Sequence, residues 1–293
     1  MAAAAAIATV GCGERTPRDE PPAPSRGNPN VLVAAGDIAG CDTDGDEATA
    51  KVLARQKPGT VAPLGDNAYE YGTEKQFREC YGPTWGRFKG RTRPAVGNHE
   101  YAQPEARGHF SYFGGAAGRA GEGWYSYEAG PWHVVVLNSM CERVACGPGS
   151  PQVRWLRADL AKSTRPCTLA YFHHPRFSSG SKHGDHPEVE TFWRELVRDR
   201  ADLVLSAHDH SYERFAPLTP SGRRSDRRGL RQIVVGTGGR SLRPFGRIKP
   251  GSMKRDAKTL GILRLDLKPR SYSWRFVPAA GGGFTDSGKA RCR

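Results

Sequence analysis

The sequence predicts an α/β domain with a largely parallel β-sheet. Three observations support this class: short apolar runs recur five times, helical patterns separate several of them, and each run ends in polar residues. The runs are residues 31–35, 60–64, 92–96, 168–172 and 203–205. Functional sites of such sheets form at the carboxyl ends of the strands. We therefore expect the polar residues that follow the runs to form one site.

The helices and remaining strands follow from the spacing of apolar residues along the chain. Apolar positions three to four residues apart predict helices over 46–57, 151–163 and 187–200. The stretch GWYSYEAGPWHVVVLN, residues 123–138, predicts a hairpin that turns at Gly130-Pro131. In the last quarter, IVVGTGG, LGILRLDL and SYSWRFV predict antiparallel strands.

The N-terminal segment differs in composition from the rest of the 293-residue chain. Residues 28–293 contain no long polar linker and predict one large domain. Residues 1–27 combine the small, apolar MAAAAAIATVGCG with the Pro-rich ERTPRDEPPAPSRG. They indicate the remnant of a lipoprotein-type export signal with Cys12 as the lipid-bearing residue, followed by a disordered tether. The alternative is a disordered Ala-rich tail. The sequence contains no run of 18 apolar residues, so it predicts no membrane-spanning helix.

The cysteine pattern agrees with export. Apart from Cys12 there are six cysteines, an even number that predicts three disulfides in an exported protein. Cys141 and Cys146 are near enough in sequence to close a small loop, whereas the other pairings stay open. No pair has the CxxC spacing of a zinc site. We expect an exported protein that is extracellular, periplasmic or lipid-anchored at the cell surface.

The positive charge is concentrated at the C-terminal end. The net charge is +14, and residues 215–293 hold 19 of the 44 Lys and Arg but four of the 30 Asp and Glu. Such a segment attracts phosphorylated substrates, anionic polymers or anionic surfaces. The alternative is a solvated basic face without a partner.

The stretch ADLVLSAHDHSYERF places His208 and His210 directly after an apolar run. In extended backbone, residues i and i+2 point to the same side, so both imidazoles are expected to aim at one metal ion and Asp209 away from it. The alternative is a solvated loop. The polar residues that follow the five runs supply a mixed oxygen and nitrogen ligand set, sufficient for two ions that share a carboxylate: Asp37, Asp66, Tyr69, Asn98, His99, His173, His174, His208 and His210.

The motifs GD, GDNAY, GNHE, FHHP and AHDHSYER, in this order, resemble the calcineurin-like metallophosphoesterases, and more narrowly their purple acid phosphatase branch. The resemblance covers residues 31–215 and extends loosely to the C-terminal FVPAAGGGFTDSGKARC. It implies a four-layer α/β/β/α sandwich in which helices flank two mixed β-sheets. Plant-type relatives carry an additional β-sandwich domain before the catalytic one. The roughly 30 residues before the first run are too few for it, so we expect residues 28–293 to be the catalytic domain, with a basic C-terminal part.

The resemblance also implies a role for each ligand. Asp37, Tyr69 and His210 would hold the first metal ion, Asn98, His173 and His208 the second, and Asp66 would bridge both. A phenolate ligand implies Fe(III) at the Tyr69 site, and the second ion would be Fe(II), Zn(II) or Mn(II). Tyr69 replaces the histidine that many relatives have two residues after the first aspartate, where this chain has Ala39. A second departure is Ala207, which stands where the family usually has glycine.

Further histidines are expected to contact the substrate. His99 is the first candidate for donating a proton to the leaving group and His183 is the second. His174, His186 and Arg176 are expected to bind substrate. The alternatives are a solvated loop for His183 and His186 and a surface position for Arg176.

These residues predict an exported binuclear metallophosphatase that hydrolyses phosphate monoesters by attack of metal-activated hydroxide. We expect a small phosphorylated substrate and no obligate protein partner. Two alternatives stay open: a phosphodiesterase or nuclease with the same fold, and a non-catalytic metal- or phosphate-binding surface protein.

Overall fold

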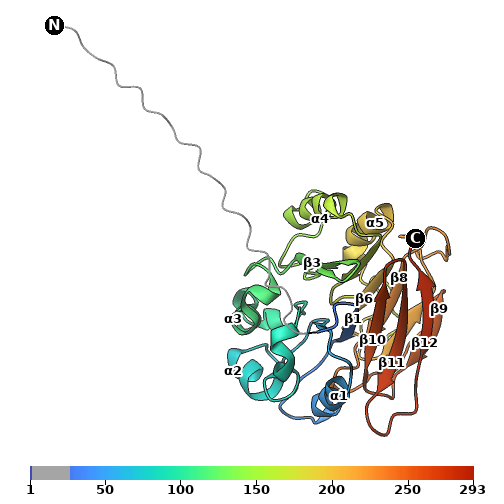
Figure 1. Ribbon diagram of the computed structural model, residues 1–293. Coiled ribbons are helices and arrows are strands. Elements are labelled where there is room, and N and C mark those ends of the chain that lie inside the picture. The colour runs from blue at the N-terminus through green and yellow to red at the C-terminus, as the bar shows by residue number, and fades with distance from the viewer. Residues whose placement is uncertain (2–26) are drawn as a thin grey trace.

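The structure is a computed structural model that describes Met1 and residues 27–293 (Figure 1). The predictions of an export signal and of a lipid-bearing Cys12 lie outside the described residues. No helix in the described part of the chain is long and apolar enough to cross a membrane.

Two mixed β-sheets form the centre of the described domain. The first has the strand order β12-β11-β10-β1-β2 and the second has the order β3-β4-β5-β6-β8-β7-β9. The strands of the first sheet are β1 Val31–Ala35, β2 Thr60–Pro63, β10 Gly261–Lys268, β11 Ser271–Pro278 and β12 Ser287–Arg291. Those of the second are β3 Tyr125–Ala129, β4 Trp132–Val136, β5 Cys167–Tyr171, β6 Leu203–Ser206, β7 Tyr212–Phe215, β8 Arg231–Val235 and β9 Ser252–Asp256.

The parallel strands are divided between the two sheets. β1 and β2 are parallel in one sheet, and β4, β5, β6 and β8 are parallel in the other. The predicted antiparallel strand in IVVGTGG was therefore only half right, because β8 is antiparallel to β7 but parallel to β6. The expectation of one largely parallel sheet is replaced by the two mixed sheets that the family resemblance implied.

The predicted strand over 92–96 was wrong. This segment makes only isolated bridges to the β2 region, Val61 with Thr92 and Leu64 with Ala95. Its Arg93 and Ala95 N–H groups do reach the Val61 and Pro63 carbonyls, at 2.8 Å each. The ladder does not continue because Pro63 and Pro94 have no N–H group to donate.

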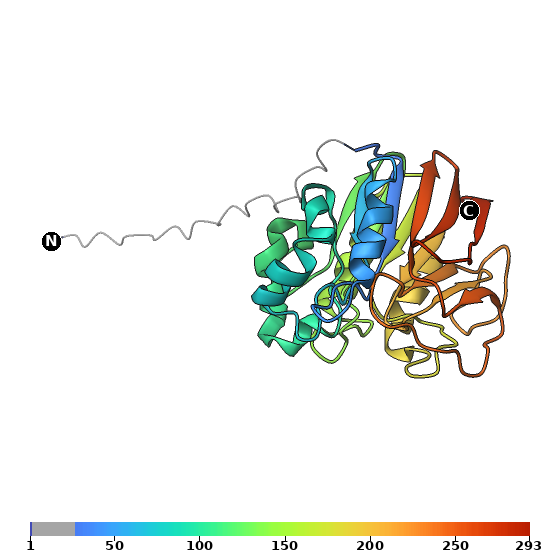
Figure 2. The same ribbon diagram turned by 90° about the horizontal axis from the view of Figure 1, so that it is seen from below.

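Alternation along the strands of the second sheet explains the layers. In β5, Leu169 and Tyr171 belong to the core that also contains the first sheet, whereas Ala170 packs into a separate core with helices α4 (Pro151–Lys162) and α5 (Glu190–Arg198). Successive side chains of a strand point to opposite faces, so one face meets the other sheet and the opposite face meets helices. Helix α1 (Gly45–Ala54) contacts β10 and β11 of the first sheet. Figures 1 and 2 show α1 on the opposite side of the domain from α4 and α5. The four-layer prediction is confirmed.

The predicted helices are present with shifted ends. They are α1 Gly45–Ala54, α4 Pro151–Lys162 and α5 Glu190–Arg198, the last preceded by the 3₁₀ turn η6 Pro187–Val189. Ser150 caps α4 by accepting a hydrogen bond from the Val153 N–H at 3.3 Å. The sequence did not reveal the short helical segments between β2 and β3, which are α2 Glu74–Gln76, η1 Phe77–Tyr81, η2 Trp85–Arg91, η3 Glu100–Ala102, η4 Pro104–Ala106, α3 Arg107–Phe113 and η5 Gly114–Ala117.

The predicted hairpin and the three predicted disulfides are confirmed. β3 and β4 pair antiparallel around Gly130-Pro131, where Gly130 has a φ of 57°. The disulfides are Cys141–Cys146, as expected, Cys41–Cys80 and Cys167–Cys292. The last joins the start of β5 to the residue after β12, and so connects the two sheets.

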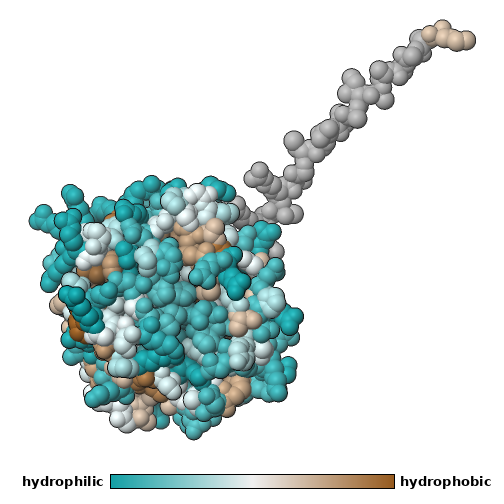
Figure 3. All heavy atoms as spheres, turned by 180° about the vertical axis from the view of Figure 1, so that it is seen from behind, coloured by the Kyte–Doolittle hydropathy of each residue, from teal (hydrophilic) through white to brown (hydrophobic). Residues whose placement is uncertain are grey.

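The outer surface of the domain is largely polar. Between residues 27 and 293, the large apolar side chains that are exposed are Tyr71, Ile248 and Met253. The face in Figure 3 shows hydrophilic residues with scattered apolar spots and no broad apolar area.

Candidate metal centre

The candidate ligands meet where the two sheets come together. Asp37 follows β1, and Asp66 and Tyr69 follow β2 in the first sheet, whereas His173 and His208 follow β5 and β6 in the second. A main-chain hydrogen bond connects the two edges, because the Gly36 N–H after β1 donates to the Val235 carbonyl of β8 at 2.9 Å. Within the second sheet, the Ala207 N–H after β6 donates to the His173 carbonyl after β5 at 2.9 Å. The site therefore depends on both sheets.

One group of ligand atoms surrounds the Tyr69 hydroxyl. This oxygen lies 2.9 Å from Asp37 Oδ1 and 3.3 Å from His210 Nε2, and the latter two atoms are 3.5 Å apart. His210 Nδ1 lies 2.9 Å from the Ser241 carbonyl and must donate to it, because a carbonyl only accepts. The lone pair of the neutral ring is thereby placed on Nε2, toward the cluster.

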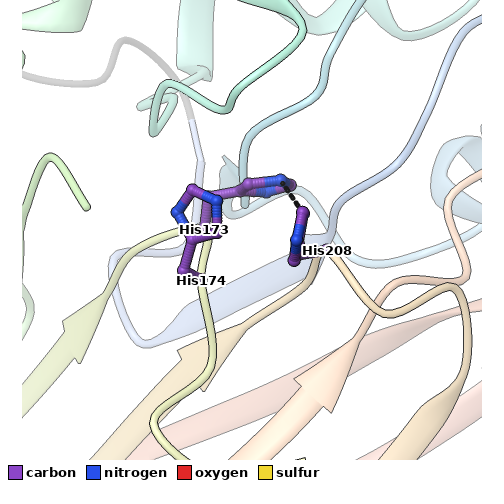
Figure 4. Close-up of side chains that lie close together, drawn as sticks. All are labelled: His173, His174 and His208. Atoms are coloured by element: carbon purple, nitrogen blue, oxygen red, sulfur yellow. Dashed lines mark hydrogen bonds between the residues drawn. The ribbon is translucent and has the colours of Figure 1, made fainter. Parts of the chain in front are cut away.

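A second group surrounds His173 Nε2. This nitrogen lies 3.1 Å from Asn98 Oδ1 and 3.1 Å from His208 Nδ1. Figure 4 shows the rings of His173 and His208 pointing toward each other from two different loops. His173 Nδ1 donates to the Leu64 carbonyl at 2.9 Å, which again leaves Nε2 for a metal ion.

Asp66 connects the two groups. Its Oδ2 lies 3.1 Å from the Tyr69 hydroxyl and 3.2 Å from His173 Nε2. Ligands at bond lengths of about 2.1 Å lie roughly 3.0–3.4 Å from one another around a common ion. The distances within the two groups, 2.9–3.5 Å, are close to this spacing, and the Asp66 carboxylate is shared between them.

The backbone at these positions is unusual. Asp37, Asp66 and His208 have φ values of 57°, 50° and 69°, in a region that non-glycine residues seldom adopt. The prediction that extended backbone aims His208 and His210 at one point was therefore wrong. β6 ends at Ser206, and the left-handed conformation at His208 directs the two rings to different groups. Asp209 does point away, accepting hydrogen bonds from the Ser178 hydroxyl and the Gly184 N–H.

The electrostatics of the cluster indicate a need for positive charge. Asp37, Asp66 and Tyr69 are almost fully buried. Burial acts to raise the pKa of Asp66, but His173 and His99 hold it below its ordinary value. Although burial acts to lower it, the carboxylates of Asp66 and Asp37 raise the pKa of His173 to about 9. In the metal-free protein a proton on His173 thus partly compensates the buried carboxylates, and bound cations would replace that proton.

Burial and the two neighbouring carboxylates raise the pKa of Tyr69 well above its ordinary value. Ionisation of this phenol therefore requires a cation close to its oxygen. Hard anionic oxygens together with imidazoles are a ligand set that suits Fe(III) beside a second divalent ion. The residues present therefore fit a two-metal centre.

Glu100 supports both ligand loops and was not recognised from the sequence. Its buried carboxylate accepts the N–H groups of Asp66 at 3.0 Å, Asn67 at 2.7 Å and Gly97 at 2.7 Å. Burial and the nearby Asp66 raise its pKa to about 7. The only sequence signal was its place at the end of GNHE, next to two candidate residues.

His99 lies at the edge of the first group. Its ring centroid is 4.3 Å from that of Tyr69, and its side chain is 27% exposed. Nδ1 donates to the Glu70 carbonyl at 2.6 Å, so Nε2 is the nitrogen that faces the cluster, 3.8 Å from Asp66 Oδ2. This position allows contact with both ligand and solvent.

Three further histidines surround His208. The ring centroids of His183, His174 and His186 lie 4.0, 4.4 and 4.8 Å from that of His208. The structure therefore brings together the histidines that the sequence proposed for substrate contact. His174 is buried, and its Nδ1 lies 2.9 Å from the Ser139 hydroxyl.

Arg243, which the sequence did not single out, contacts this group of histidines. Its Nη1 donates to His183 Nε2 at 2.8 Å, and its main-chain N–H donates to the His210 carbonyl at 2.9 Å. Because guanidinium only donates, the proton of the neutral His183 ring lies on Nδ1. Burial lowers the pKa of His183 to about 4, which is consistent with a neutral ring.

The structure does not bring Arg176 into the cluster. Its Nη2 donates to Glu190 Oε2 and to the Pro220 carbonyl, both at 3.2 Å, and its side chain is 11% exposed. The guanidinium therefore connects α5 to the loop that contains Pro220. This geometry gives no support to the predicted contact of Arg176 with substrate.

The departure at residue 207 is accommodated by a neighbouring glycine. A Cβ placed on Gly36 would lie 2.4 Å from the Ala207 Cβ. The methyl group of Ala207 thus occupies space that only a glycine at position 36 leaves open.

The chain belongs to the calcineurin-like phosphoesterase family. The family model described as "Calcineurin-like phosphoesterase" matches residues 20–212, which include all of the candidate ligands. This confirms the resemblance drawn from the five motifs.

Similar proteins agree with the purple acid phosphatase branch. The chain is 29% identical over 235 residues to purple acid phosphatase 23 of Arabidopsis thaliana, covering 66% of this chain and 50% of the relative. It is 28% identical over 254 residues to purple acid phosphatase 1 of Ipomoea batatas, covering 75% and 52%. It thus spans about half the length of these relatives.

A solved structure shares the fold. Purple acid phosphatase PPD1 from yellow lupin (Lupinus luteus) seeds matches with a TM-score of 0.76 at 17% identity, covering 89% of this chain and 53% of that chain. At this identity the likeness concerns the fold alone, and it agrees with the four-layer architecture described above.

Proposed function

We propose that this chain is a binuclear metal-dependent phosphoesterase that hydrolyses phosphate monoesters. The observation that carries the proposal is the position of Asp66 Oδ2, 3.1 Å from the Tyr69 hydroxyl and 3.2 Å from His173 Nε2. A carboxylate shared between two buried ligand groups is the arrangement that a two-metal phosphoesterase needs.

The ligand roles follow from the two groups of atoms. Asp37, Tyr69 and His210 would hold Fe(III), and Asn98, His173 and His208 would hold Fe(II), Zn(II) or Mn(II), with Asp66 between them. When bound, the two ions activate a water molecule for attack on phosphorus and neutralise the charge of the phosphoryl oxygens.

His99 is the residue best placed to move a proton to the leaving group. The hydrogen bond from Nδ1 to the Glu70 carbonyl fixes the ring, and Nε2 faces the cluster with access to solvent. His183 is suited to a different task. Because Nε2 accepts from Arg243, its Nδ1 carries the proton and can donate a hydrogen bond to a phosphoryl oxygen. His174 and His186 complete the substrate side around His208.

A phosphodiesterase or nuclease is the second candidate. It is favoured by two basic residues of the 215–293 segment that contact the loop carrying His183 and Asp185. Arg243 donates to His183, and Lys249 Nζ lies 2.9 Å from Asp185 Oδ2. We further propose that residues 28–293 form the catalytic domain of an exported protein, which the three disulfides support.

Metal analysis and paired assays test the proposal. Protein folded under oxidising conditions should contain two metal ions per chain, including iron, and should show a visible absorption band that Tyr69→Phe removes. An aryl phosphate monoester should be hydrolysed faster than a bis-aryl diester. Faster hydrolysis of the diester would favour the second candidate. Failure to bind metal after reconstitution would reject both enzymes.

A further inference from the structure

Arg240 lies over the aromatic ring of Tyr69. The guanidinium carbon is 4.6 Å from the ring centroid, a cation–π distance. The Arg240 side chain is 14% exposed, although arginine side chains are usually mostly exposed. A largely buried positive charge therefore lies on the ring of the tyrosine in the first ligand group.

Three contacts hold Arg240 in this place. Nη1 donates to Asp42 Oδ1 at 2.6 Å, and Nη2 donates to Glu70 Oε1. The main-chain N–H donates to the carbonyl of Asp37 at 3.0 Å. A planar guanidinium can contact two carboxylates and an aromatic ring at once, whereas a lysine ammonium has no such fork.

The chain leaves room for this arrangement at Gly40. A Cβ at this position would lie 2.3 Å from Arg240 Nη1 and 2.5 Å from Asp42 Oδ1. Any other residue would require the guanidinium or the Asp42 carboxylate to move from its position. The glycine is thus part of the same arrangement.

Glu70 connects Arg240 with the candidate proton donor. Its carboxylate binds Arg240, its carbonyl accepts from His99 Nδ1 at 2.6 Å, and its Oε2 lies 3.7 Å from the same nitrogen. His99 in turn contacts the Tyr69 ring. A displacement of Arg240 would therefore change the positions of both Tyr69 and His99.

We propose that Arg240 is a positioning residue for Tyr69: it holds the phenol ring toward the first ligand group, and its charge stabilises the electron-rich ring of the metal-bound tyrosine. The inference rests on the proposed function, in which Tyr69 binds iron. It adds a residue outside the five sequence motifs to the determinants of metal affinity and colour.

The visible band provides the most direct test. In a tyrosine–Fe(III) site this band arises from transfer of an electron from the phenolate to the iron. A positive charge on the ring lowers the energy of the phenolate electrons, so its removal should shift the band to longer wavelength. Arg240→Met keeps much of the length and apolar packing but removes the charge. Arg240→Lys keeps the charge but loses the fork, and should give a smaller shift.

Metal affinity provides a second readout that does not require colour. We expect Arg240→Met to weaken binding of iron, measured by competition with a chelator, by roughly five- to thirty-fold. Arg157→Met is the matched control. It also removes a guanidinium that is paired with a carboxylate, Glu195 at 2.6 Å, but on the α4–α5 side of the domain. The control should leave both the band and the affinity unchanged.

The outcomes separate the inference from the proposed function. An unchanged band and affinity in Arg240→Met would overturn the inference and leave Arg240 as an anchor of its loop. Should that variant not fold, Arg240→Gln also removes the charge but keeps a side-chain N–H group for Asp42 or Glu70, and should shift the band in the same direction. If the unsubstituted protein binds metal without colour, the ferric assignment fails, and Arg240 is judged by its effect on Zn(II) affinity alone.

Discussion

Replacing Glu100 by glutamine tests whether the loops that carry the ligands need their common anchor. The Glu100 carboxylate accepts Asn67 N–H at 2.7 Å and Ala68 N–H at 3.3 Å on Oε1, and Asp66 N–H at 3.0 Å and Gly97 N–H at 2.7 Å on Oε2. Glutamine keeps one acceptor oxygen and turns the other position into a donor that faces two N–H groups. At about 1.5–3 kcal/mol for each hydrogen bond to a charged acceptor, this loss costs roughly 3–6 kcal/mol.

The substitution also removes an unfavourable buried charge. Burial and Asp66 raise the pKa of Glu100 from an ordinary 4.5 to about 7. At a pH well above 7, this pKa shift means that the ionised Glu100 carboxylate lowers the free energy of unfolding by about 3 kcal/mol. The neutral amide of glutamine avoids this loss. The two effects largely offset each other in the free energy of unfolding. They do not offset each other in metal binding, because the loops of Asp66 and Gly97 lose their connection. Metal affinity should fall about 10- to 100-fold.

The assay compares metal affinity, by chelator competition, with the urea midpoint of the metal-free protein. Asp202→Asn is the matched control, since the Asp202 carboxylate also accepts two main-chain N–H groups, from Thr168 at 2.9 Å and Arg293 at 2.7 Å, at the opposite end of β5 and β6 from the metal centre. The control should change stability without changing affinity. A Glu100→Gln protein that binds metal as tightly as the unsubstituted one would refute the reasoning.

Three further predictions concern other parts of the domain. Burial raises the pKa of Asp202 from 3.8 to about 6, so its contribution to stability is present below pH 3.8 and is lost as pH rises through 6. The free energy of unfolding of the metal-free protein should fall by up to about 3 kcal/mol between pH 4 and pH 7, and Asp202→Asn should remove this fall. An equal fall in both proteins would contradict the prediction. Arg176→Met should lower the free energy of unfolding by about 1–3 kcal/mol but leave kcat/KM within about three-fold of the unsubstituted value. A large rise in KM would instead support the sequence prediction that Arg176 binds substrate. Arg243→Met frees His183 and should lower kcat/KM about ten-fold, whereas an unchanged value would show that His183 needs no such partner.

Much of the candidate site could be predicted from the sequence, because each ligand follows a short buried segment. GD after residues 31–35 and GDNAY after residues 60–64 identified Asp37, Asp66 and Tyr69 from local patterns. The local geometry was less predictable. Alternation along an extended strand was the wrong model for His208, since the chain leaves the strand at Ser206 and His208 adopts a φ of 69°. Similarly, Pro63 and Pro94 interrupted the ladder that the apolar run 92–96 suggested.

By itself, the sequence determined the positions of most of the buried strands and of the three longer helices, and the identity of the residues that follow those strands, because hydrophobic periodicity and motif spacing are local properties. The tertiary structure decided which strands share a sheet and which ligands share a group. It also decided which charged residues support them. Arg240 contacts Asp42 and Glu70 across 198 and 170 positions of the chain. No local pattern contains such contacts, because they exist only once the two sheets have packed and brought their carboxyl edges together.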